Sequence, residues 1–262
     1  MEISTSKFTP FEIIEPLANN ISELLEIAKG IQIEQPDKGY RFAIDPFLLV
    51  ADITPKEGEE ILDIGTGCGI IPLLLATKYP HINITAVEIQ NELAEIAQKN
   101  IKINNLCRRI KLINNDIKEV QIRDIEPSYI DKHNTTNYSR VRKCYSNHFR
   151  ADFIVNCGFD RIISNPPYKK KGSGRLNSDI QKAIARHEIA LTLDELIFNA
   201  VRFLKTDGIL NLIYPFCRLK ELLHTISKYS IEPIQIKYLF TTKLQMSIDK
   251  PRFVLMVGKK RG

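Results

Sequence analysis

The chain has 262 residues and a mass of 30.0 kDa, enough for one large domain or one domain with a small appendage. Hydrophobic residues make up 44% of it and charged residues 26%, which excludes wholesale disorder. Its 37 Lys and Arg residues exceed its 31 Asp and Glu residues and give a net charge of +6. Such an excess fits a polyanionic partner such as nucleic acid, although a lysine-rich coding bias would produce it as well.

The sequence lacks the marks of membrane insertion and of oxidative folding. No apolar stretch reaches the length of a membrane span, and the first residues lack the basic, apolar and small-residue zones of a signal peptide. The cysteines are odd in number and scattered, without the paired spacing of a zinc ribbon or a disulfide framework. They are Cys68, Cys107, Cys144, Cys157 and Cys217. We therefore expect a reduced, cytoplasmic protein that needs no metal.

Residues 1–40 are predicted to form an irregular leader that holds one helix. Asn20 has the side chain of a helix N-cap, apolar residues follow at helical spacing, and Gly30 suits the position after the helix end. A second helix is predicted at Asp45, whose side chain can cap it. Pro46 then occupies the first turn, where a missing N–H is tolerated.

Short apolar strands then alternate with helices. Strands are expected at 61–64, 82–87, 110–113, 159–164 and 209–214, and helices at 71–77, 92–103, 192–203 and 219–229. Thr192 and Glu195 form a capping box at the start of the third of these helices. The alternation predicts an α/β domain over residues 41–262, with a mostly parallel sheet between two layers of helices. Two last strands, at 234–240 and 252–257, favour an antiparallel edge hairpin.

One segment interrupts this alternation. Residues 121–152 are polar and show no clear periodicity, which indicates an insertion on the surface of the domain. Both a disordered loop and a small folded element fit this composition.

A glycine-rich turn, made by Gly65, Thr66, Gly67 and Gly69, follows the first predicted strand and leads directly into a helix. Glycines let the backbone turn sharply and approach a ligand closely. However, the third glycine of a dinucleotide fingerprint and the Gly-Lys-Ser/Thr of a phosphate-binding loop are both missing. Asp63, just before the turn, would repel a pyrophosphate and suits a cationic amino-acid group instead.

Polar side chains also stand at the ends of the next two strands. Glu88 is positioned to accept hydrogen bonds from two ribose hydroxyls, and a side chain near Asp116 can meet an adenine amino group. An adenosyl ligand with a cationic tail and no phosphate describes S-adenosylmethionine, the predicted cofactor. The residues predicted to bind it are Asp63, Gly65, Thr66, Gly67, Gly69, Glu88, Ile89, Asp116 and, from the fourth strand, Asn165.

The fourth strand ends in a motif suited to methylation of a planar nitrogen. Ligands bind beyond the carboxyl ends of parallel strands, so Asn165 is expected to face the methyl group. Two prolines stiffen the backbone and leave carbonyl oxygens as acceptors beside the Asn165 side chain. Acceptors that hold the hydrogens of an amide or exocyclic amine bias its nitrogen toward a tetrahedral nucleophile. The predicted catalytic residues are Asn165, Pro166, Pro167 and Tyr168, the last stacking on the substrate; the alternative is a rigid turn.

Cations follow this motif directly, separated by glycines. They can clamp a phosphate backbone, or they can belong to a solvated loop. The residues predicted to bind RNA are Lys169, Lys170, Lys171, Arg175, Lys182 and Arg186. His187 and Glu188 fit either a pair that orients the substrate or an ordinary helix surface.

These motifs resemble those of Rossmann-like class I S-adenosylmethionine-dependent methyltransferases over about residues 41–258. That resemblance implies a seven-stranded sheet whose last strand is antiparallel. Asn165–Tyr168 is similar to the Asn-Pro-Pro-Tyr signature of enzymes that methylate adenine N6, cytosine N4 or glutamine side chains. Together with residues 39–45 and 185–188, it resembles the tRNA (adenine-N6)-methyltransferases that act on the anticodon loop of a valine tRNA. By this resemblance Arg41 helps to close over the methionine end of the cofactor, and the partner is RNA, most simply tRNA.

Three other functions fit parts of this pattern. Glutamine N5-methyltransferases of release factors share the motif but carry a sizeable helical domain before the glycine turn, whereas here only 62 residues precede Asp63. Guanine-N2 methyltransferases of ribosomal RNA often have a duplicated domain. An RNA-binding or assembly module without turnover would keep the fold but not need Asp63, Glu88 and Asn165 together.

Overall fold

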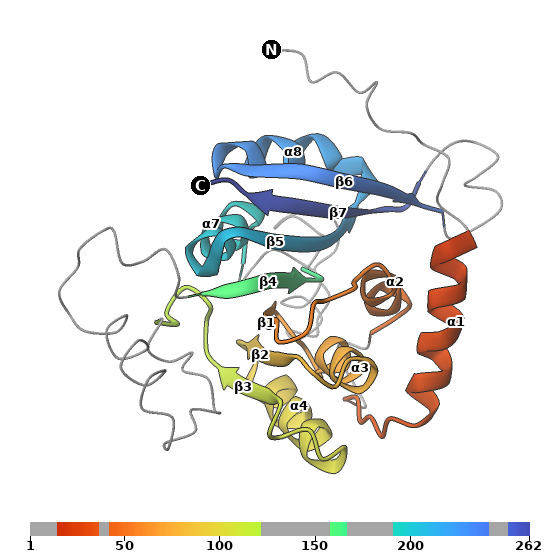
Figure 1. Cartoon of the computed structure of the whole chain (residues 1–262). Coiled ribbons are helices and arrows are strands. Elements are labelled where there is room, and N and C mark those ends of the chain that lie inside the picture. The colour runs from red at the N-terminus through yellow and green to blue at the C-terminus, as the bar shows by residue number, and fades with distance from the viewer. Residues whose placement is uncertain (1–14, 37–41, 122–157, 167–190, 241–250) are drawn as a thin grey trace, which may run out of the picture.

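The computed structural model describes residues 15–36, 42–121, 158–166, 191–240 and 251–262, and it contains one seven-stranded sheet (Figure 1). The strand order is β3-β2-β1-β4-β5-β7-β6. The strands are β1 (Glu60–Ile64), β2 (Asn83–Glu88), β3 (Ile110–Asn114), β4 (Phe159–Ser164), β5 (Leu204–Pro215), β6 (Ile231–Leu239) and β7 (Phe253–Lys260).

The sheet is mostly parallel. Strands β1 to β5 pair in parallel, whereas β7 runs antiparallel to both of its neighbours, β5 and β6. The predicted fold class is therefore confirmed, and so is the hairpin of the last two strands. The outermost strand of that hairpin is β6, because β7 inserts between β5 and β6. All five parallel strands bring their carboxyl ends to one edge, which is where such sheets bind ligands.

Helices pack on both faces and create two cores. The helices are α1 (Glu15–Lys29), α2 (Asp45–Ala51), α3 (Ile70–Lys78), α4 (Asn91–Ile103), α7 (Leu193–Phe203) and α8 (Leu219–Lys228), with a short 3-10 helix η4 (Phe216–Arg218). Ile61 of β1 points into the core shared with α1, α2 and α3, while the next residue, Leu62, points into the core shared with α7 and α8. This alternation follows from the two-residue period of a strand, and Figure 1 shows the two helix groups on opposite sides of the sheet.

Three local predictions need correction. Helix α1 begins at Glu15, so Asn20 lies inside it, and its amide instead donates to the Ala51 carbonyl of α2 at 2.9 Å. Helix α2 includes Asp45, with Ile44 at its N-cap and no side-chain cap. Strand β5 begins at Leu204 and not at the predicted residue 209; the φ of 64° at Asp207 and a shift in the pairing with β4 mark a bulge near its start. Tertiary contacts thus override local capping signals at these points.

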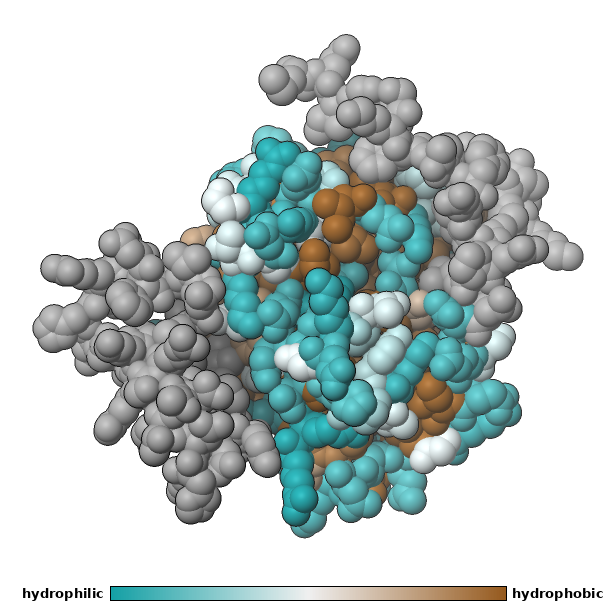
Figure 2. All heavy atoms as spheres, viewed as in Figure 1, coloured by the Kyte–Doolittle hydropathy of each residue, from teal (hydrophilic) through white to brown (hydrophobic). Residues whose placement is uncertain are grey.

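The described surface is polar with scattered apolar side chains. Figure 2 shows one face as largely hydrophilic, with separate hydrophobic patches. The exposed large hydrophobic residues come from five different places in the chain: Leu25, Ile44, Ile89, Phe198 and Ile234. Within the described ranges, no helix is long and apolar enough to cross a membrane. The predicted insertion lies almost entirely outside the described residues.

Candidate functional site

The glycine turn connects β1 to α3 and is fixed from two sides. The backbone N–H groups of Gly65 and Thr66 donate to the Val87 carbonyl of β2 at 2.9 and 3.0 Å. On the other side, Gly69 has a φ of +88°, and a Cβ there would meet the Ala97 Cβ of α4 at 3.4 Å. Glycine is required at this position by its left-handed backbone, because side chains rarely adopt that region. The turn is thereby held between β2 and α4.

Asp63 is fully buried just before this turn, and neither of its carboxylate oxygens has a hydrogen-bond partner among the described residues. Burial raises the pKa of the Asp63 carboxyl to about 7, and the negative charge of nearby Glu88 adds to that rise. Burial of an ionised carboxylate without a partner costs on the order of several kcal/mol of desolvation free energy. A neighbouring cation can offset that cost. The position is therefore suited to a cationic ligand group.

Glu88 ends β2 and shapes the turn directly. Its carboxylate accepts hydrogen bonds from the N–H of Gly67 at 2.8 Å and from the N–H of Gln90 at 2.9 Å. Burial raises the pKa of Glu88, while these backbone N–H groups oppose the rise. Each oxygen keeps a second lone pair, so the carboxylate can still accept from ligand hydroxyls. Ile89 follows with 40% of its surface exposed, as an apolar side chain beside a binding site would be.

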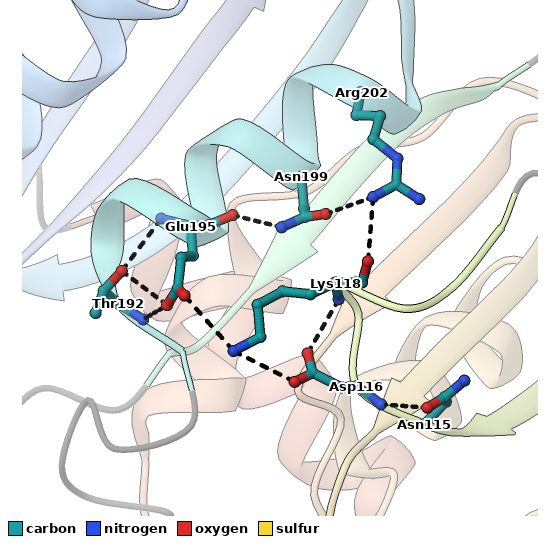
Figure 3. A network of polar contacts seen from close by, with 7 residues as sticks. All are labelled: Asn115, Asp116, Lys118, Thr192, Glu195, Asn199 and Arg202. Carbon is teal, nitrogen blue, oxygen red and sulfur yellow. Dashed lines mark hydrogen bonds and ion pairs between the residues drawn. The ribbon is translucent and has the colours of Figure 1, made fainter.

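Asp116, beyond the tip of β3, is tied to α7 through Lys118 (Figure 3). One Asp116 oxygen accepts from the Lys118 backbone N–H at 3.0 Å, and the other lies 3.3 Å from the Lys118 ammonium. That ammonium also lies 3.5 Å from Glu195 in the capping box of α7. Arg202 of α7 donates to the backbone carbonyls of Lys118 and Val120. The segment after β3 is therefore held against α7.

The tip of β4 is attached to the tip of β1. The Ser164 hydroxyl is buried and donates to the Ile64 carbonyl at 2.8 Å. Because Asn165 follows Ser164 and Gly65 follows Ile64, this bond brings the catalytic motif next to the glycine turn. Asn165 is half-buried and Pro166 is buried. The predicted cofactor-binding residues and the predicted catalytic residues therefore share one edge of the sheet.

Comparisons with known proteins identify this arrangement. A family model described as the methyltransferase small domain matches residues 41–126. A tRNA1(Val) (adenine(37)-N6)-methyltransferase from Porphyromonas gingivalis is 32% identical over 198 residues, which is 74% of this chain and 66% of that protein, just under two thirds of its length. A protein of the same name from Shewanella putrefaciens is 28% identical over 79% of this chain and 74% of its own. Residues 41–126 are thus similar to the methyltransferase small domain family.

Solved structures agree with a class I methyltransferase fold. A methyltransferase from Pyrococcus furiosus has a TM-score of 0.56 at 21% identity, with 94% of this chain and 98% of the other covered. A putative RNA methyltransferase from Pyrococcus horikoshii has a TM-score of 0.54 at 14% identity, with 94% and 100% covered. At these identities the likeness concerns the fold alone.

The residues of this site fit an S-adenosylmethionine cofactor, whose use the similarity to methyltransferases implies. Buried polar atoms without a described partner gather around the turn: both Asp63 carboxylate oxygens, the Thr66 hydroxyl and the Gln90 side-chain oxygen. Buried polar groups are normally satisfied, so this set indicates that a polar ligand completes the site. Asp63 matches an ammonium group, and Glu88 matches ribose hydroxyls.

The structure leaves some of the predicted site residues undescribed and adds others. The predicted residues that lie outside the described ranges are Arg41, Pro167, Tyr168, Lys169, Lys170, Lys171, Arg175, Lys182, Arg186, His187 and Glu188. Sequence reasoning missed Ser164 and Lys118, which join strand tips to one another and to α7. A single Ser or Lys beside a strand end has no distinctive spacing, so no sequence signal marked them.

Proposed function

We propose that this methyltransferase uses S-adenosylmethionine to methylate N6 of an adenine in the anticodon loop of a tRNA. Relatives of the chain are named for methylation of adenine 37 in a valine tRNA, which supports that substrate. The observation that carries the proposal is the bond between Ser164 and the Ile64 carbonyl, because it sets Asn165 beside the buried Asp63 and the glycine turn. A cofactor pocket and an amine-holding motif then meet at one sheet edge.

In this proposal three strand tips hold the cofactor. When bound, it supplies an electrophilic methyl group on a sulfonium. Asp63 receives the ammonium of the methionine moiety and thereby gains the partner that the described chain does not provide. Glu88 accepts from the ribose hydroxyls, and its bonds to Gly67 and Gln90 keep its carboxylate oriented. Asp116, oriented by Lys118, faces the adenine amino group.

Asn165 prepares the substrate nitrogen. Its side-chain oxygen and a neighbouring carbonyl accept the two N6 hydrogens of the target adenine. This arrangement aims the nitrogen lone pair at the methyl group. The new N–C bond would form as the sulfur–methyl bond breaks, so that S-adenosylhomocysteine leaves as a neutral thioether, and one N6 proton would pass to solvent to leave neutral N6-methyladenine. Alignment of the reacting atoms supplies much of the acceleration, and no strong general base is needed.

An anticodon loop suits this site physically. Unstacking an unpaired base costs roughly a few kcal/mol of free energy. Such a base can therefore enter a pocket that a paired base cannot reach. Tyr168 would stack on the extruded adenine. The cations from Lys169 to Arg186 would contact the phosphate backbone.

The decisive experiment is methyl transfer in vitro. The protein is incubated with labelled cofactor and with transcripts of valine tRNA, with the same tRNA carrying guanine for the target adenine, with ribosomal RNA and with a release factor. Nucleoside mass spectrometry should find N6-methyladenosine in the unaltered tRNA alone. Label in the release factor or as N2-methylguanosine would reject the proposal.

Asn165→Ala separates chemistry from cofactor binding. Turnover should fall by at least a hundredfold, on the order expected when an oriented catalytic contact is lost, while binding of S-adenosylhomocysteine changes little. Undiminished turnover would remove Asn165 from the mechanism.

Neutralisation of the cations after the motif tests the RNA contact. Replacing Lys169, Lys170 and Lys171 with Gln should weaken tRNA binding and flatten its dependence on salt. Lys259 and Arg261 offer a matched control, because they pair with Asp207 at 2.8 Å and with Glu232 at 3.0 Å. Their replacement with Gln should leave the salt dependence intact, and equal effects of the two sets would exclude a specific clamp.

A further inference from the structure

Two asparagines, Asn100 in α4 and Asn104 at its C-cap, hold the leader by the same interaction. Asn104 accepts from the Gln32 N–H at 3.0 Å and donates to the Gln32 carbonyl at 2.7 Å. One helical turn earlier, Asn100 accepts from the Glu34 N–H at 2.8 Å and donates to the Glu34 carbonyl at 2.9 Å. Each side-chain amide thus pairs with a backbone N–H and carbonyl as a neighbouring strand would. Residues 31–36 are fastened along α4 at two points.

Asn100 makes one bond that Asn104 does not make. Its Nδ2 also donates to the Cys68 carbonyl inside the glycine turn at 2.9 Å. Both amide hydrogens and the oxygen of Asn100 are therefore used, and the side chain is fully buried. Ala97, one turn before Asn100 on the same helix, lies beside Gly69, where an added Cβ would meet the Ala97 Cβ at 3.4 Å. Helix α4 thus fixes the glycine turn and the leader through adjacent positions of one face.

The turn and the leader that Asn100 joins both carry or adjoin buried polar atoms without a partner among the described residues. The turn carries the Gly67 N–H, which orients Glu88, and it follows the unpartnered Asp63. The leader carries Gln35, one residue after the Glu34 that Asn100 binds. The Gln35 side-chain oxygen is buried without a described partner, like the oxygens of Asp63. Asn100 is the described side chain that hydrogen-bonds to both segments.

We propose that Asn100 is a positioning residue of the cofactor site, which holds residues 31–36 against the glycine turn in the geometry that binds the cofactor. The inference rests on the proposed use of S-adenosylmethionine. It gives the leader a role in cofactor binding in addition to packing. It also distinguishes Asn100 from Asn104, whose bonds fasten the leader without reaching the turn.

Asn100→Ala and Asn104→Ala provide a matched pair. Each removes the two bonds that its asparagine makes with the leader, and Asn100→Ala also frees the Cys68 carbonyl. The dissociation constant of S-adenosylhomocysteine is measured by calorimetry, and kcat and the KM for the cofactor are measured with tRNA. We expect Asn100→Ala to raise the dissociation constant and the KM about tenfold, the factor for one lost buried hydrogen bond, with a smaller change in kcat. Asn104→Ala should change both by less than about twofold.

Two further measurements keep the inference falsifiable. Urea unfolding without ligand reports how far each variant is destabilised. Asn100→Ser serves if the alanine variant does not fold, with the shift in unfolding midpoint by saturating S-adenosylhomocysteine as its readout. Equal loss of affinity in the Asn100 and Asn104 variants, or unchanged affinity in both, would overturn the positioning role. Absence of binding by the unsubstituted protein would instead refute the proposed cofactor.

Discussion

Asp63 provides the sharpest test of the cofactor site, because its ionisation must change when a ligand binds. Burial raises the pKa of this carboxyl to about 7, so near neutral pH the free protein holds Asp63 partly protonated. An ammonium group placed beside it favours the carboxylate and lowers the pKa again. Binding of S-adenosylhomocysteine should therefore release a proton from Asp63, and acid should oppose binding.

The size of the effect follows from the two titrations. With a pKa of about 7, the ionised fraction of Asp63 falls from about 0.7 at pH 7.4 to about 0.03 at pH 5.5. A free α-amino group, with a pKa of about 7.7–8.0, is already mostly protonated at pH 7.4 and gains little. Binding should weaken on the order of tenfold between these two pH values. Asp63→Asn should bind more weakly at pH 7.4 and lose this dependence.

The same shift predicts an opposite effect on the stability of the free protein. A carboxyl whose folded pKa is raised above its unfolded value of 3.8 favours folding at low pH and loses that contribution as pH rises through about 7. Asp63→Asn avoids the loss, so its advantage in unfolding free energy should grow by about 2 kcal/mol between pH 5.5 and pH 8. Calorimetry and urea unfolding at both pH values measure the two effects. Parallel pH profiles for the variant and the unsubstituted protein would refute the reasoning.

Three further substitutions test other parts of the structure. Glu88→Ala leaves the Gly67 N–H without its acceptor and should weaken binding of S-adenosylhomocysteine at least about tenfold; unaltered affinity in calorimetry would remove the ribose assignment. Arg161→Met strands the buried carboxylate of Glu59, which Arg161 contacts at 2.8 and 3.1 Å, and should destabilise the fold by about 3–5 kcal/mol in urea; a change below 1 kcal/mol, roughly, would contradict this. Thr192→Ala breaks the capping box of α7 and should cost about 1 kcal/mol without changing ligand affinity, so an affinity loss would show that α7 contributes to the site.

Much of the fold could be predicted because its signals are local and repeated. The β4 prediction at 159–164 matches the structure, and the predicted capping box of Thr192 is present. The N-cap at Asn20 was wrong, because packing on α2 recruits its amide to the Ala51 carbonyl. Strand β5 was predicted too short, since a bulge at Asp207 interrupts its pairing with β4 but does not end the strand. The ends of helices and strands depend partly on contacts between residues that are far apart in the sequence, and local sequence signals do not contain that information.

The candidate site likewise contains residues that the sequence could predict and residues that depend on tertiary contacts. Asp63 and Glu88 could be placed because a strand tip has a fixed direction, so an acid there meets whatever lies beyond the sheet edge. Asn100 and Ser164 could not, because their partners are backbone groups, which residues all along the chain offer. Which carbonyl such a side chain meets depends on a packing distance between α4 and the turn, or between two strand tips, and not on residue spacing. The groups proposed to contact the cofactor are thus easier to predict from sequence than those that hold them in place, and the latter are where a structure adds most.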